Sequence, residues 1–164
     1  MKRILLTLIA SVALISAHAQ FEQKKKYINA SVSELNMSFN DKTDLSGNFN
    51  LAVGYFVDNN FLVKGDVGYG YADESNRFNA GLGTRYYFQR NGVFVGVGGN
   101  LSWREHGGYR GHGKWLVDVP AEVGYAFFIN RHVTIEPALY YKVCLNEFKD
   151  YSEAGFKIGF GVYF

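Results

Sequence analysis

Apolar and polar residues alternate along most of this chain, from about Tyr27 to Phe164. A period of two residues is typical of β-strands whose two faces meet different environments. The pattern predicts eight strands, around residues 27–39, 48–57, 61–71, 78–88, 93–103, 115–127, 133–143 and 156–164. Only the first stretch loses its phase, at Glu34 and Leu35, which predicts a β-bulge there.

The connections between these stretches alternate in length. Short turns are expected at residues 58–60, 89–92 and 130–131, and longer loops at 40–47, 72–77, 104–114 and 145–154. This alternation predicts an up-and-down antiparallel arrangement with turns at one rim and loops at the other. An even number of strands would also return both chain ends to the rim that carries the turns.

The first residues have the features of a secretory signal peptide. Lys2 and Arg3 precede a mostly apolar run, and Ala17-His18-Ala19 matches the small-residue cleavage pattern. The apolar run is shorter than the roughly 20 residues that a transmembrane helix needs. We therefore expect a signal peptide at residues 1–19, a periplasmic N-terminal segment at 20–26, and a β-domain at 27–164.

The composition of the two strand faces separates a membrane barrel from a soluble one. The apolar face carries Val, Leu and Ile in mid-strand and aromatic residues toward the strand ends, as a lipid-facing surface does. The other face is rich in small residues, with many of the chain's 19 glycines, and lacks the density of charge that a water-exposed exterior requires. The sequence thus predicts an all-β fold: an eight-stranded antiparallel up-and-down transmembrane β-barrel with short periplasmic turns and longer extracellular loops. A soluble ligand-binding barrel is the alternative.

Charged residues on the inward face balance in sign. They are Lys64, Arg85, Lys142 and Lys157 against Asp66, Asp118, Glu122 and Glu136. Buried charges are tolerated when they are paired, and the interior of an eight-stranded barrel is just wide enough for side chains. We therefore expect a lumen charge network and a plugged lumen, with a narrow channel for small or hydrophobic solutes as the alternative.

The overall charge gives no reason to expect a nucleic-acid partner. Of the 17 Lys and Arg residues, two lie within residues 1–19, which hold none of the 15 Asp and Glu residues. The remaining chain is therefore formally neutral, without the basic excess that nucleic-acid binding favours.

Two segments resemble a known group of proteins. The run Val53-Gly54-Tyr55-Phe56-Val57-Asp58-Asn59-Asn60 is similar to a strand-turn unit of the porin-like outer-membrane β-barrel domains, and the chain ends in Gly159-Phe160-Gly161-Val162-Tyr163-Phe164. This group includes the membrane domain of outer-membrane protein A and outer-membrane protein X. The resemblance implies location in the cell outer membrane, contact with its lipid, and a C-terminal assembly signal at Phe160, Val162 and Phe164, read by the barrel-assembly machinery. We expect a monomer.

The predicted loop at 104–114 is the most distinctive candidate binding segment. Its binding residues would be Arg104, His106, Tyr109, Arg110, His112 and Lys114. Cationic and aromatic side chains of this kind suit lipopolysaccharide phosphates or the surface of an unidentified extracellular partner. The two histidines have no third ligand at a fixed spacing, so no metal site is predicted. No cofactor is expected either, because the glycine-rich pieces lie within strands and open no helix.

A catalytic role requires a nucleophile, a base and an orienting group. The local candidates are Ser102, Glu105 and His106, but Ser102 faces inward by parity. A surface lipid hydrolase is therefore a weaker alternative. The expected function is non-enzymatic: an envelope anchor or a surface interaction protein that acts through its outer loops.

Overall fold

The computed structural model describes residues 21–39, 43–72, 75–88, 92–105, 113–146 and 152–164. Its strands are β1 (Lys26–Phe39), β2 (Thr43–Asp58), β3 (Phe61–Ala72), β4 (Ser75–Tyr87), β5 (Val93–Glu105), β6 (Gly113–Tyr125), β7 (Phe127–Phe128), β8 (Val133–Cys144) and β9 (Glu153–Tyr163). Within these described ranges, no helix is long and apolar enough to cross a membrane.

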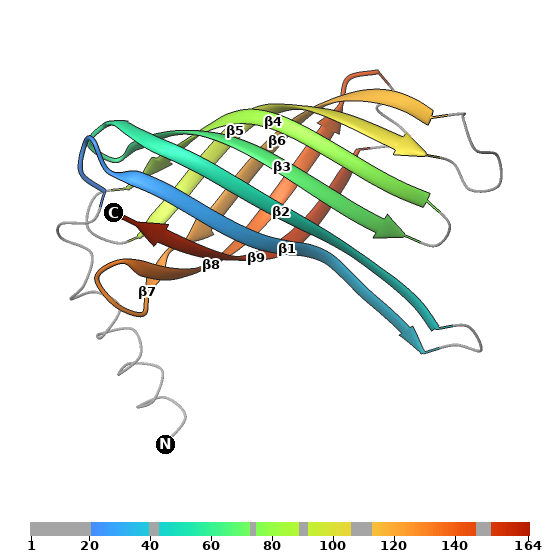
Figure 1. Cartoon of the computed structure of the whole chain (residues 1–164), viewed down its shortest axis with the longest axis horizontal. Coiled ribbons are helices and arrows are strands. Elements are labelled where there is room, and N and C mark those ends of the chain that lie inside the picture. The colour runs from blue at the N-terminus through green and yellow to red at the C-terminus, as the bar shows by residue number, and fades with distance from the viewer. Residues whose placement is uncertain (1–20, 40–42, 73–74, 89–91, 106–112, 147–151) are drawn as a thin grey trace.

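The strands form one closed antiparallel barrel. β1 to β6 pair in chain order, β8 pairs with β6, β7 and β9, and β9 pairs with β1 to close the barrel. The prediction of an eight-stranded antiparallel up-and-down barrel is confirmed, and Figure 1 shows the strands wound obliquely around one common axis.

The predicted sixth strand is split into β6 and β7, although both keep the same register against β8. Gly124 lies opposite Ala138, and Phe127 lies opposite Ile135. In this register the gap between the two ladders, at Tyr125 and Ala126, lies opposite Pro137 and Glu136, and Pro137 has no N–H to donate. β7 is therefore the end of the sixth strand of the barrel rather than a ninth one.

The predicted bulge in the first strand is also confirmed. The register between β1 and β2 shifts between Ser33 and Asn36, and the pairing of β1 with β9 ends at Ser33. Beyond this point β1 pairs only with β2, and the two strands extend past their neighbours in Figure 1.

Two of the connections that were predicted to be long are shorter than expected. β1 ends at Phe39 and β2 begins at Thr43, while β3 ends at Ala72 and β4 begins at Ser75. Polar residues at the strand ends had been assigned to loops because they interrupt the apolar alternation, but backbone pairing continues through them.

We call the end of the barrel that carries these connections the loop rim. The opposite end, with the three short turns and both ends of the described chain, is the turn rim.

The two faces of the strands are separated as the alternation predicts. Many outward apolar side chains are exposed, from 37% for Val162 to 73% for Leu82, whereas Asn48, Phe56 and Leu62 on the inward face are buried. A barrel with an apolar exterior and a polar interior has the polarity of a protein surrounded by lipid.

Inward glycines make room for large polar side chains from the neighbouring strand. A Cβ atom on Gly96 would lie 2.7 Å from Oε1 of Glu122, and one on Gly81 would lie 1.8 Å from Oδ1 of Asn100. Each long side chain thus packs against the backbone of a glycine, which carries no side chain of its own. The glycines that the sequence places on the inward face allow polar groups to fill a narrow lumen.

Candidate functional site

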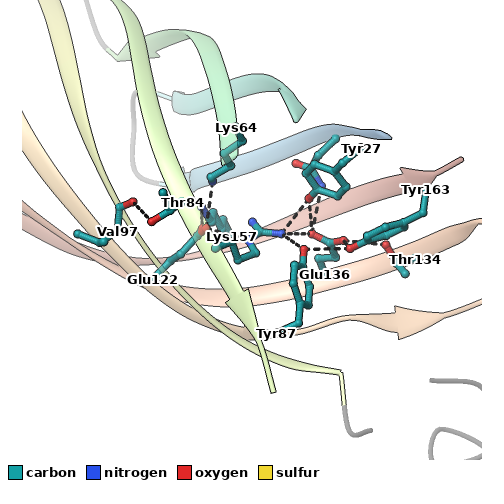
Figure 2. A network of polar contacts seen from close by, with 12 residues as sticks. Tyr27, Lys64, Thr84, Tyr87, Val97, Glu122, Thr134, Glu136, Lys157 and Tyr163 are labelled. Atoms are coloured by element: carbon teal, nitrogen blue, oxygen red, sulfur yellow. Dashed lines mark hydrogen bonds and ion pairs between the residues drawn. The ribbon is translucent and has the colours of Figure 1, made fainter. Parts of the chain in front are cut away.

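A buried carboxylate, Glu136 of β8, is the centre of a hydrogen-bond network in the lumen near the turn rim. Its Oε2 accepts hydrogen bonds from Tyr27 Oη at 2.6 Å and from Arg85 Nη1 at 2.7 Å. Its Oε1 accepts from Tyr163 Oη at 2.6 Å and from Thr134 Oγ1 at 2.8 Å. Figure 2 shows these side chains converging from β1, β8 and β9. A buried carboxylate with this many donors is satisfied without water.

Arg85 connects this centre to a second buried carboxylate, Glu122 of β6. Arg85 Nε and Lys64 Nζ each lie 3.0 Å from Glu122 Oε1, and Lys157 forms an ion pair with Oε2 of the same residue. The Arg85 guanidinium also lies 4.0 Å from the ring centroid of Phe94. Five charged groups from five strands are therefore held in one network across the lumen.

An aromatic cluster fills the lumen between this network and the turn rim. Its buried members are Phe21, Tyr27, Phe56, Leu62, Tyr87, Phe94, Ala126, Ala138 and Tyr163, with Phe128 packed against them. The tyrosines join the two layers: Tyr87 Oη lies 3.0 Å from Tyr163 Oη and accepts a hydrogen bond from Arg85 at 2.9 Å. This end of the lumen is filled by rings.

A polar cavity of about 90 Å³ lies in the lumen, on the side of the charge network that faces the loop rim. Asparagine and serine side chains line much of it, and Asn79 donates to Asn50 at 3.2 Å, which donates in turn to Asn48 at 3.4 Å. The cavity is polar and has room for several water molecules. It is too small for a drug-sized ligand, which occupies pockets of several hundred Å³.

Closer to the loop rim, polar side chains form separate small groups. Ser102 Oγ donates to Asp118 Oδ2 at 2.6 Å, with both residues buried. Glu153 of β9 forms ion pairs with Lys142 and with Arg77, the latter at 3.5 Å. Glu153 retains 28% exposure of its side chain, so this group is partly open to solvent.

The structure brings five of the eight predicted lumen charges together: Lys64, Arg85, Lys157, Glu122 and Glu136. The other three lie apart from this network. Asp66 lines the polar cavity without an ion pair to another described residue, Asp118 is bonded to a serine, and Lys142 is paired with Glu153, which had been assigned to a loop. The inward charges therefore form one network of five, and the other three have separate surroundings closer to the loop rim.

The predicted loop site is described only at its two ends. Arg104 and Lys114 are directly opposite each other on β5 and β6. His106, Tyr109, Arg110 and His112 lie outside the described residues, as does His106 of the hydrolase alternative. Among the residues that the structure does describe, no group of three His, Cys, Asp or Glu side chains could hold a metal ion.

Of the predicted assembly signal, Phe160 and Val162 lie on the outer face of β9, and Phe164 directly follows the strand. Phe160, Val162 and Phe164 are 54%, 37% and 54% exposed. They are therefore accessible from the outside of the barrel, next to the seam where β9 pairs with β1.

Sequence reasoning missed the aromatic members of the site. Tyr87 and Tyr163 each stand between two outward apolar residues, so their inward position could have been inferred from parity alone. Phe21 had no such signal, because it precedes β1 and belongs to no alternating stretch.

No protein-family model matches this chain, and no curated protein matches its sequence. Solved structures do match its fold. The N-terminal β-barrel domain of OprF from Pseudomonas aeruginosa is 16% identical, with a TM-score of 0.66 over 87% of this chain and 98% of that domain. Ail from Yersinia pestis, in a phospholipid bilayer nanodisc, is 13% identical, with a TM-score of 0.59 over 87% of this chain and 100% of that one.

The Neisserial surface protein NspA is 13% identical, with a TM-score of 0.56 over 85% of this chain and 96% of that one. At such identities the likeness concerns the fold. Together with the closed barrel, it bears out the resemblance noted in the sequence: this chain has the fold of the small eight-stranded outer-membrane β-barrel proteins.

Proposed function

We propose that this protein is an integral outer-membrane barrel with a closed lumen, which serves as a non-enzymatic envelope anchor and presents its loop rim for surface interactions. The observation that carries the proposal is the inverted polarity of the barrel. Leu82, Leu101 and Val97 are 73%, 55% and 55% exposed on the outer face, whereas Arg85, Glu122 and Glu136 are in the interior. A soluble barrel would carry its charged residues outside.

The packing of the lumen supports a closed barrel. The aromatic cluster fills the lumen at the turn rim, and the charge network lies directly above it. An ion that crossed the barrel would have to displace both layers, and separating a buried ion pair is costly.

The membrane location can be tested by separating the cell envelope and comparing gel mobility with and without boiling in detergent. We expect recovery with the outer membrane and a boiling-dependent shift, because a closed barrel resists detergent until it is heated. Recovery in the soluble fraction without a shift would contradict the proposal and support the soluble ligand-binding barrel.

The orientation can be tested with an epitope tag on intact cells. A tag inserted within residues 106–112, at the loop rim, should be accessible to antibody from outside. The matched control is the same tag within residues 89–91, at the turn rim, which should become accessible only after the envelope is opened. The reverse pattern would place the loops in the periplasm.

A narrow channel is a second candidate, favoured by the polar cavity of about 90 Å³ within the lumen. Recording in planar bilayers separates the two functions. The closed anchor should give no single-channel steps under conditions in which a reconstituted porin does, while reproducible steps from the wild-type protein would favour transport.

A further inference from the structure

We propose that the mouth of the lumen at the turn rim is a binding site for an aromatic side chain carried on a short peptide. Phe21 occupies this site as a ligand supplied by the same chain. The short segment of residues 21–25, here named the N-terminal strap, is therefore a plug that docks into the barrel.

The pocket around the Phe21 ring is built from aromatic residues of several strands. The ring stacks on Tyr87 with centroids 4.0 Å apart and planes at 18°, and it meets Tyr163 edge-on at 5.6 Å. Phe128 and Phe56 close the sides at 5.5 Å and 6.1 Å. Phe21 is only 5% exposed. Stacked and edge-on contacts of this kind favour a planar ring over an aliphatic side chain of similar size.

The turn between β2 and β3 recognises the backbone of the strap. Asn60 N–H donates to the Phe21 carbonyl at 2.7 Å, and Gln23 N–H donates to Asn59 Oδ1 at 3.0 Å. The Gln23 side chain donates to the Val57 carbonyl at 2.9 Å. This is the turn of the strand-turn unit noted in the sequence, and the contacts give it a role as the receptor for the strap.

The conformation of both partners favours this docking. Asn60 has a φ of 66°, a left-handed conformation that asparagine tolerates well, and its carbonyl accepts from Tyr87 N–H while its own N–H is donated to the strap. In the strap, Lys24 has a φ of 75° and Lys25 N–H lies 3.4 Å from the Glu22 carbonyl. This turn reverses the chain before β1 and directs Phe21 back into the lumen.

Other aromatic residues at the same rim show that this insertion is specific. Phe88 and Phe127 belong to the alternating pattern, and they are 42% and 41% exposed on the outer face. Phe21 precedes the first strand, yet it is buried in the lumen. Its position is thus set by the pocket and by the turn rather than by strand parity.

The test measures peptide binding to the full chain in detergent with residue 21 changed. The probe is a fluorescent peptide with the sequence Gln-Phe-Glu-Gln-Lys-Lys, and the control peptide has Ala in place of Phe. The Phe21→Ala variant should bind the Phe peptide about tenfold or more tightly than the Ala peptide, because a buried ring adds more than one decade in affinity. The wild-type chain should bind neither, since its pocket is filled.

The Phe88→Ala variant is the matched control. It removes an exposed ring from the same rim and should bind neither peptide. Equal binding of the Phe peptide to wild type and to Phe21→Ala would overturn the proposal, and so would no binding to a Phe21→Ala barrel that still shows its boiling-dependent shift.

If Phe21→Ala does not fold, the Gln23→Ala variant tests the proposed binding site instead. This variant keeps the ring but removes the hydrogen bond to the Val57 carbonyl, so the strap should detach more often. We expect it to bind the Phe peptide measurably and the Ala peptide not at all. A folded Gln23→Ala barrel that discriminates between the Phe and Ala peptides no better than the wild-type chain does would overturn the proposal.

Discussion

The two halves of the lumen are filled in different ways. In the half toward the turn rim, aromatic rings pack against one another, and Arg85 and Glu136 lie between them with 4% and 2% side-chain exposure. In the half toward the loop rim, short polar side chains surround a cavity of about 90 Å³, and the ion pairs of Glu153 are partly exposed.

This difference predicts that the two halves respond differently to the loss of a polar side chain. Where rings exclude water, each polar group must find a protein partner, and removing one leaves another buried without compensation. Where asparagine and serine surround a cavity, a lost hydrogen bond can be replaced by water. We therefore expect substitutions near the turn rim to be much more costly than equivalent ones near the loop rim.

The largest expected effect is that of Glu136→Ala. The substitution leaves Arg85, Tyr27 and Tyr163 without their shared acceptor, and breaking a buried ion pair costs about 3–5 kcal/mol. The matched substitution near the loop rim, Glu153→Ala, should cost less, about 1–3 kcal/mol, because Glu153 itself is 28% exposed although its partners Arg77 and Lys142 are buried. Urea unfolding of both variants in the same detergent measures these free energies, and equal losses would contradict the contrast between the halves.

An intermediate effect is expected from Gly96→Ala. The new Cβ would lie 2.7 Å from Glu122 Oε1 and 3.0 Å from the Thr84 carbonyl, so the charge network would have to move. Overpacking of this kind costs about 1–3 kcal/mol. Gly99→Ala is the control, since its Cβ would point outward with nothing within 4 Å, and it should leave the free energy of unfolding unchanged. A loss in Gly99→Ala as large as in Gly96→Ala would show that backbone effects, rather than the lumen, set the cost.

The smallest effect is expected from Asn79→Ala, which removes the hydrogen bond to Asn50 beside the cavity. We expect a loss of about 1 kcal/mol in the free energy of unfolding, the typical net value of one hydrogen bond. The same urea titration measures it. A loss approaching that of Glu136→Ala would mean that the polar half is as tightly coupled as the aromatic half.

The sequence predicted most of the fold because the alternation of side chains is a local property. The order of the strands follows from the alternating lengths of the connections, whereas the bulge after Ser33 and the inward direction of Glu122 follow from parity along each strand. Strand ends were less predictable. Ser75, at the start of β4, had been placed in a loop because backbone pairing continues after the apolar pattern has stopped.

The candidate site could be predicted only in part. Parity indicates that Lys64, Arg85 and Lys142 point inward, but it does not indicate which carboxylate each one meets. That depends on the stagger of the strands around the closed barrel, which sets the height of each residue in the lumen.

The sequence by itself thus determined whether each strand residue faces the lumen or the outside of the barrel, because successive side chains of a β-strand point to opposite faces of the sheet. Only the tertiary structure decided which inward groups meet, since Glu136 and its partner Arg85 come from β8 and β4, which share no backbone ladder. It also placed Phe21 in the lumen, because the pocket for its ring exists only after the strands that supply Tyr87 and Tyr163 have closed around it.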